Sequence, residues 1–146
     1  MYEYEQTKYM LKQKIKELFA NDCSGHDYWH SIRVLNIAEK ISKTEKCNEY
    51  IVMVAALLHD TDDIKIFKTT DYENARCIMS ECHLTKDTID TVIDIIKEIS
   101  FKSTETTSPK SIEGKIVQDA DRLDAMGAIG IARAFAYGGN HNRMIH

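Results

Sequence analysis

Apolar residues recur along most of the chain at the three- and four-residue spacing of an α-helix. No stretch alternates apolar and polar residues as a half-buried β-strand does. We therefore expect an all-α fold. The pattern predicts helices around residues 11–19, 28–43, 51–58, 72–82, 89–99 and 111–137, with a break in the last one near Gly127.

The predicted helix over residues 51–58 is apolar on every side, which is typical of a helix at the centre of a domain. It runs directly into His59 and Asp60, with Asp62 and Asp63 close behind. A buried carboxylate is unfavourable unless it is paired or bound to a metal. The acids at the end of this core helix therefore indicate a functional site.

A second inward-facing histidine lies on the predicted helix over residues 28–43. His30 precedes Val34 by four residues, so it shares the apolar stripe of that helix. One histidine on an apolar face is usually a hydrogen-bonded core residue. Two of them together with Asp60 favour a metal site. Imidazole and carboxylate ligands suit Mn, Fe, Co, Ni or Zn, and Mg where carboxylate and water dominate.

A third polar cluster is the stretch QDADRLDAMG, residues 118–127. Its simplest interpretation is a solvated helix face, on which Asp119 pairs with Lys115 one turn earlier. Asp121 instead falls on the less polar side of the helix, with Val117. Asp121 is therefore the better candidate for an inward-facing ligand.

Composition limits the partners of the protein. The chain has 146 residues, 43% of them hydrophobic, which suffices for one domain with a core. Its net charge of −4 gives no electrostatic reason to expect a nucleic acid polymer or an anionic membrane as partner. No apolar run approaches a membrane span of about 20 residues. The N-terminal residues lack the apolar core of a signal peptide, so we expect a cytoplasmic protein with reduced cysteines.

Three motifs in order, HDYWHSIRV, AALLHD and VQDADRLDAMGAIG, resemble the HD-domain superfamily of metal-dependent phosphohydrolases. The resemblance spans residues 25–139 and is greatest to the bacterial branch that includes nucleoside triphosphate pyrophosphohydrolases. It implies a helical bundle with a central metal site. His30, His59, Asp60 and Asp121 match the four metal ligands of the family, and we expect a divalent ion (Mn, Mg, Co, Fe or Ni) there.

The resemblance also implies roles for residues around the metal. Asp63 occupies the position of an acid that handles water or substrate in relatives, so we expect it to be catalytic. His26 lies one turn before His30 and is a further candidate, either as a proton donor or as an additional metal ligand, with a helix-cap role as the alternative. Arg33 follows His30 by three residues and could reach a phosphate, and its alternative is a surface salt bridge. Further basic candidates for substrate binding are Lys65, Lys115 and Arg122.

The expected activity is metal-dependent hydrolysis of a phosphate ester or anhydride, with a nucleotide as the small phosphorylated substrate. The alternative is a non-catalytic HD module that senses a nucleotide or a metal. The alarmone hydrolases of the superfamily carry an acid at the position of Ile64 and Asn at that of Ala125, so we expect little activity on guanosine tetraphosphate. Relatives usually continue beyond AYGG, which leaves open whether this single HD domain, residues 1–146, lacks C-terminal helices or an interface of a homo-oligomer.

Overall fold

The computed structural model of the protein describes residues 2–20, 27–64, 66–99 and 108–144. Its helices are α1 (Tyr2–Leu18), α2 (Tyr28–Ser42), α3 (Glu49–Leu58), α4 (Glu73–Glu81), α5 (Lys86–Ile99), α6 (Ile112–Asp124) and α7 (Gly127–Asn140). The described ranges contain no β-strand, which confirms the all-α fold. Within them, no helix is both long enough and apolar enough to cross a membrane.

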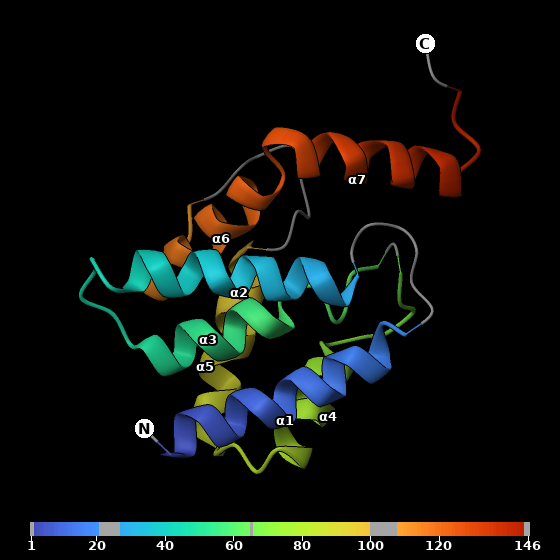
Figure 1. Cartoon of the computed structure of the whole chain (residues 1–146). Coiled ribbons are helices and arrows are strands. Elements are labelled where there is room, and N and C mark those ends of the chain that lie inside the picture. The colour runs from blue at the N-terminus through green and yellow to red at the C-terminus, as the bar shows by residue number, and fades with distance from the viewer. Residues whose placement is uncertain (1, 21–26, 65, 100–107, 145–146) are drawn as a thin grey trace.

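Helix α3 is the centre of the bundle, as its uniformly apolar sequence predicts. Every residue in the range 51–58 is buried. The helix packs against α1, α2, α5 and α6, which surround it in Figure 1. Burying each large apolar side chain contributes about 1.5–3 kcal/mol relative to leaving it exposed. The end of α3 is therefore a rigid support for the His59–Asp60 pair that follows it.

Polar side chains fix where α2 and α6 begin. The Asp27 carboxylate accepts a hydrogen bond from the backbone N–H of His30, and the Ser111 hydroxyl accepts one from the N–H of Gly114. Such N-caps satisfy backbone donors that the helix itself leaves unpaired. In α2 the N-cap residue lies three residues before His30, whose imidazole is on the buried side of the helix.

The predicted break near Gly127 is confirmed. Helix α6 ends at Asp124, and Gly127 begins α7 with φ of 68°, a left-handed conformation that glycine adopts without strain. Helix α7 then passes over the end of α6, where a Cβ added to Gly130 would lie 2.0 Å from the carbonyl oxygen of Ala125. Only glycine fits this crossing. None of the α7 residues is buried, and the helix forms an outer layer at the top of Figure 1.

Candidate metal centre

His30 projects from α2 into the core and is fully buried. Its Nδ1 atom lies 2.7 Å from Oδ2 of Asp124. The carboxylate can only accept, so Nδ1 carries the proton and donates it. When the imidazole is neutral, Nε2 therefore presents its lone pair to the interior on the opposite side of the ring.

His59 reaches the same point from the end of α3. Its Nδ1 atom donates to the carbonyl oxygen of Ala56 over 2.9 Å, which likewise leaves the lone pair on Nε2. The Nε2 atoms of His30 and His59 lie only 3.2 Å apart. Two lone pairs that face each other at this distance repel unless a proton or a metal ion lies between them.

Two carboxylates complete the group. Oδ2 of Asp60 lies 3.2 Å from Nε2 of His30 and 3.4 Å from Nε2 of His59. Oδ1 of Asp121 lies 3.4 Å and 3.7 Å from the same two atoms. The structure thus brings together all four side chains that the sequence predicts as ligands, from α2, the end of α3 and α6.

The distances within this group fit a single ion. Nitrogen and oxygen ligands about 2.1 Å from one metal ion lie about 3.0–3.4 Å apart at right-angled to tetrahedral geometry. Of the four separations between a carboxylate oxygen and Nε2 of His30 or His59, three are 3.2–3.4 Å and lie in this range. The fourth, between Asp121 and His59, is slightly longer at 3.7 Å. His30, His59 and Asp121 also form a group of ligand atoms that lie within 4.8 Å of one another. The donor set therefore fits a divalent cation.

The electrostatics of the group also favour a cation. Burial lowers the pKa of His30, but its hydrogen bonds with Asp121, Asp124 and Asp60 outweigh burial and raise that pKa to about 10. Burial likewise lowers the pKa of His59, while the charge of Asp60 and the hydrogen bond with Asp121 raise it, and the net shift is upward. Burial raises the pKa of Asp121, but both histidines together hold it well below its usual range. Without metal, protons supply the positive charge that the carboxylates require.

The acids that follow Asp60 have different environments. Asp62 accepts hydrogen bonds from the backbone N–H groups of Asn74 and Ala75 and from the hydroxyl of Thr69, so it caps the start of α4. Asp63 is half-buried in the turn after α3, and its backbone N–H donates to the carbonyl oxygen of Asp60. Asp63 is therefore the acid of this pair that remains a candidate for catalysis.

The predicted basic residues are distributed over different surfaces. Arg33 forms an ion pair with the buried carboxylate of Asp124, which differs from the surface salt bridge that was its expected alternative. Lys115 and Arg122 are exposed on α6. His26 and Lys65 lie outside the described residues, so their predicted roles stay predictions.

The model of the HD domain matches residues 28–126, which include all four candidate ligands. The chain belongs to the HD domain family. The His59–Asp60 dipeptide is thus the HD motif of this domain.

Several relatives have the same fold. Protein YpgQ of Bacillus subtilis is 41% identical over 138 residues, which cover 88% of this chain and 65% of that protein. A crystal structure of YpgQ in complex with ADP matches with a TM-score of 0.80 and 36% identity over 100% of this chain and 72% of that one. An HD-superfamily hydrolase from Bacillus thuringiensis matches with a TM-score of 0.74 and 37% identity, covering 98% and 70%. The chain thus spans 65–72% of the length of these relatives.

Sequence reasoning alone does not single out two further residues beside the candidate metal centre. Asp124 is buried beside His30, and its carboxylate also accepts hydrogen bonds from Arg33 and from Arg133 of α7. The available signal is spacing, because Asp124 follows Asp121 by three residues and therefore lies on the same side of α6. No comparable signal indicates Arg133, whose contact depends on how α7 crosses α6.

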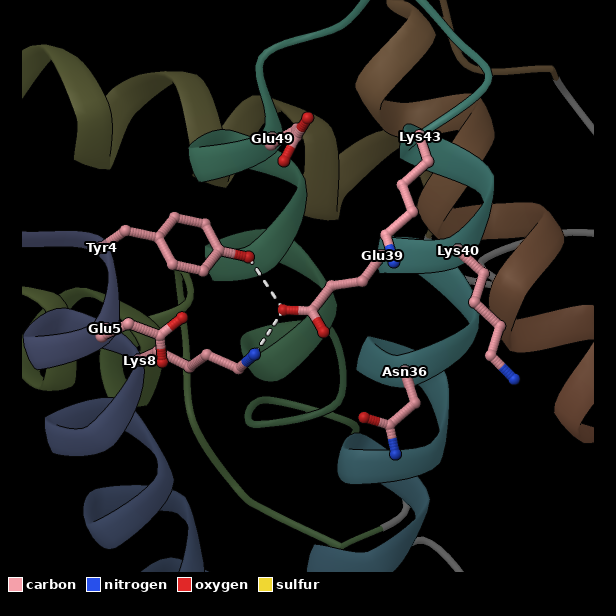
Figure 2. Close-up of a pocket in the computed structure, with 8 residues that line it drawn as sticks. All are labelled: Tyr4, Glu5, Lys8, Asn36, Glu39, Lys40, Lys43 and Glu49. Atoms are coloured by element: carbon pink, nitrogen blue, oxygen red, sulfur yellow. Dashed lines mark hydrogen bonds and ion pairs between the residues drawn. The ribbon is translucent and has the colours of Figure 1, made fainter. Parts of the chain in front are cut away.

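A separate pocket of about 750 Å³ lies between α1, α2 and the start of α3. Figure 2 shows Tyr4 and Lys8 of α1 converging on Glu39 of α2, to which the tyrosine hydroxyl donates over 2.8 Å. Lysines and glutamates line the pocket in equal numbers, and no candidate metal ligand is among its lining residues. The polar contacts here attach α1 to α2.

Proposed function

We propose that the protein is a metal-dependent phosphohydrolase that acts on a phosphate ester or anhydride of a nucleotide. The observation that carries this proposal is the meeting of two imidazole Nε2 atoms and two carboxylates in the buried centre of the HD domain. Such a donor set requires positive charge, either from protons or from a metal ion, and a divalent ion at that position can assist hydrolysis.

His30, His59, Asp60 and Asp121 would hold the ion. When bound, a divalent ion polarises a phosphoryl oxygen and lowers the pKa of a water molecule toward neutrality. Mn, Mg, Co, Fe and Ni are all compatible with these ligands. The histidines act only as ligands, because each Nδ1 already donates to Asp124 or to Ala56.

Asp63 is the proposed general base. It lies in the turn directly after the HD motif and is half-buried. A carboxylate there can orient the attacking water and accept its proton. His26, one turn before His30 in the sequence, is the proposed second group for proton transfer.

Arg33 is the best supported of the proposed phosphate-binding residues. Its Nε and Nη2 groups donate to Asp124, so the guanidinium is fixed beside His30 and its Nη1 group can donate to a phosphate. Lys65, Lys115 and Arg122 are the further candidates. That YpgQ was crystallised with ADP supports a nucleotide as the substrate. The finer proposal is a nucleoside triphosphate pyrophosphohydrolase.

The direct test measures the release of phosphate and pyrophosphate from a panel of ribonucleotides and deoxyribonucleotides. Each substrate is assayed with Mn²⁺, Mg²⁺, Co²⁺ and Ni²⁺, and with EDTA as the metal-free control. The proposal expects metal-dependent turnover of at least one nucleotide, and release of pyrophosphate alone from a triphosphate would support the finer assignment. Turnover that is unaffected by EDTA would contradict the proposal.

The second candidate function is a non-catalytic sensor of a nucleotide or metal. The ADP complex of YpgQ supports binding as directly as it supports hydrolysis. Calorimetric titration separates the two functions, because a sensor binds a nucleotide with micromolar or tighter affinity while the same protein releases no product from it. Binding together with turnover favours the enzyme.

A further inference from the structure

Asp124 connects His30 of the candidate metal centre with Arg33 of α2 and Arg133 of α7. Asp124 lies three residues after Asp121 on α6, and each of the two carboxylates lies near a different nitrogen of the His30 ring. Asp121 faces Nε2 at 3.4 Å, whereas Asp124 faces Nδ1 at 2.7 Å. Asp124 is thus the residue that fixes the tautomer and the ring orientation of His30.

The Asp124 carboxylate is itself held by two arginines from different helices. Arg33 of α2 donates to Oδ1 over 2.7 Å through Nε, and to Oδ2 over 3.1 Å through Nη2. Arg133 of α7 donates to Oδ2 over 2.9 Å through Nη1. The oxygen that accepts the His30 proton is therefore also the oxygen that Arg133 contacts.

Arg133 stands out among the residues of α7. The helix contains no buried residue, and it packs mainly on α6. Two features on one side of α7 fix its place: the close approach of Gly130 to the backbone of Ala125, and the ion pair of Arg133 three residues later. The Arg133 side chain is only 17% exposed, so the ion pair is partly shielded from solvent.

We infer that Asp124 positions His30 for metal binding, and that Arg133 makes this positioning depend on where α7 lies. This inference rests on the proposed metal centre. A movement of α7 that withdraws Arg133 removes one donor from the oxygen that holds His30. The outermost helix of the described fold would in this way alter the affinity of the buried site for its ion without contacting the ion.

The test is a titration of the metal-free protein with Co²⁺, read both as a dissociation constant and as the visible absorption spectrum of the bound ion. The spectrum reports the arrangement of the ligands around the cobalt ion. If the role of Asp124 were purely structural, replacing it would leave this spectrum unchanged. The variants are Asp124→Ala, Asp124→Asn and Arg133→Gln. Arg143→Ala is the matched control, because this exposed arginine lies against the ring of Tyr137 and not against Asp124.

Loss of an outer-shell partner typically costs about 10- to 100-fold in metal affinity. We expect Asp124→Ala to show a loss of this size with an altered spectrum, and Asp124→Asn to recover part of it because the amide oxygen still accepts the His30 proton. Arg133→Gln should show a smaller loss, and Arg143→Ala none. Circular dichroism of each metal-free variant verifies the fold, and Asp124→Asn and Arg133→Gln carry the test if Asp124→Ala does not fold.

The outcomes separate this inference from the proposed function. If the wild-type protein binds no Co²⁺, the proposed metal centre and the inference that rests on it are both refuted. If the wild type binds Co²⁺ and both Asp124 variants match its affinity and spectrum, only the positioning role is wrong. If the Asp124 variants lose affinity while Arg133→Gln equals Arg143→Ala, the connection to α7 is refuted.

Discussion

Replacing Asp121 with Asn should remove most of the stabilisation of the protein by metal. Oδ1 of Asp121 lies 3.4 Å and 3.7 Å from the two Nε2 atoms, so it would supply one of four ligands. Asp121→Asn keeps the size of the side chain but removes its charge. The matched control is Asp119→Asn, because Asp119 is exposed on the opposite face of the same helix.

The magnitude follows from mass action. An ion present at 100 times its dissociation constant stabilises the folded protein by about 2.7 kcal/mol. For a chain of this size, 1 kcal/mol shifts the melting temperature by about 2–4 °C, which predicts a rise of about 5–11 °C for the wild type. If the lost ligand weakens binding about 100-fold, the same ion concentration yields only about 0.4 kcal/mol, or about 1–2 °C.

The assay is thermal unfolding of the metal-stripped proteins with and without Mn²⁺, followed by circular dichroism. We expect Asp119→Asn to retain the full rise and Asp121→Asn to lose most of it. An equal rise in both variants would show that Asp121 is not a ligand. Loss of the rise in Asp119→Asn alone would transfer the ligand role to that residue.

Three further predictions concern catalysis, substrate and pH. Asp63→Asn should keep its metal and its melting temperature while turnover falls about 100-fold or more, the usual scale for a general base; loss of the metal, measured by elemental analysis, would make Asp63 a ligand instead. Guanosine tetraphosphate should have a lower specificity constant than the best nucleotide, because Ile64 and Ala125 lack the side chains that alarmone hydrolases carry at those positions; a higher kcat/KM for the alarmone would refute this. The affinity for Mn²⁺ should rise between pH 6 and pH 9, because the ion must displace protons from His30, whose pKa in the metal-free protein is about 10, and from His59. Calorimetry in buffers of different ionisation enthalpy measures this proton release, and an affinity that does not change with pH would contradict it.

The helices could be predicted from the sequence because their packing follows directly from apolar periodicity. The stripe of Leu11 and Ile15 is buried in α1, and the uniformly apolar residues 51–58 form the buried helix α3. The predicted break near Gly127, within the helix expected over residues 111–137, is also correct, since Gly127 begins α7 with a positive φ. The same periodicity separates Asp121, on the inner side of α6, from the exposed Asp119.

The surroundings of the metal centre could not be predicted in this way. Periodicity assigns a side chain to one face of its helix but does not say which residue of another helix it meets. Arg33 was equally compatible with a phosphate and with an ion pair, because the answer depends on where α6 places Asp124. Arg133 gave no signal, since its contact requires the close crossing of α7 over α6 that Gly130 permits.

The most direct test of the proposed function is the rate of product release from the best nucleotide by EDTA-stripped protein as Mn²⁺ is added back. The account predicts negligible turnover without metal and a rate that rises with occupancy of the site. The His59→Ala variant should remain inactive at every Mn²⁺ concentration at which the wild type is saturated. Full turnover by the stripped protein, or by His59→Ala, would contradict the assignment of the two histidines and two aspartates as the catalytic metal centre.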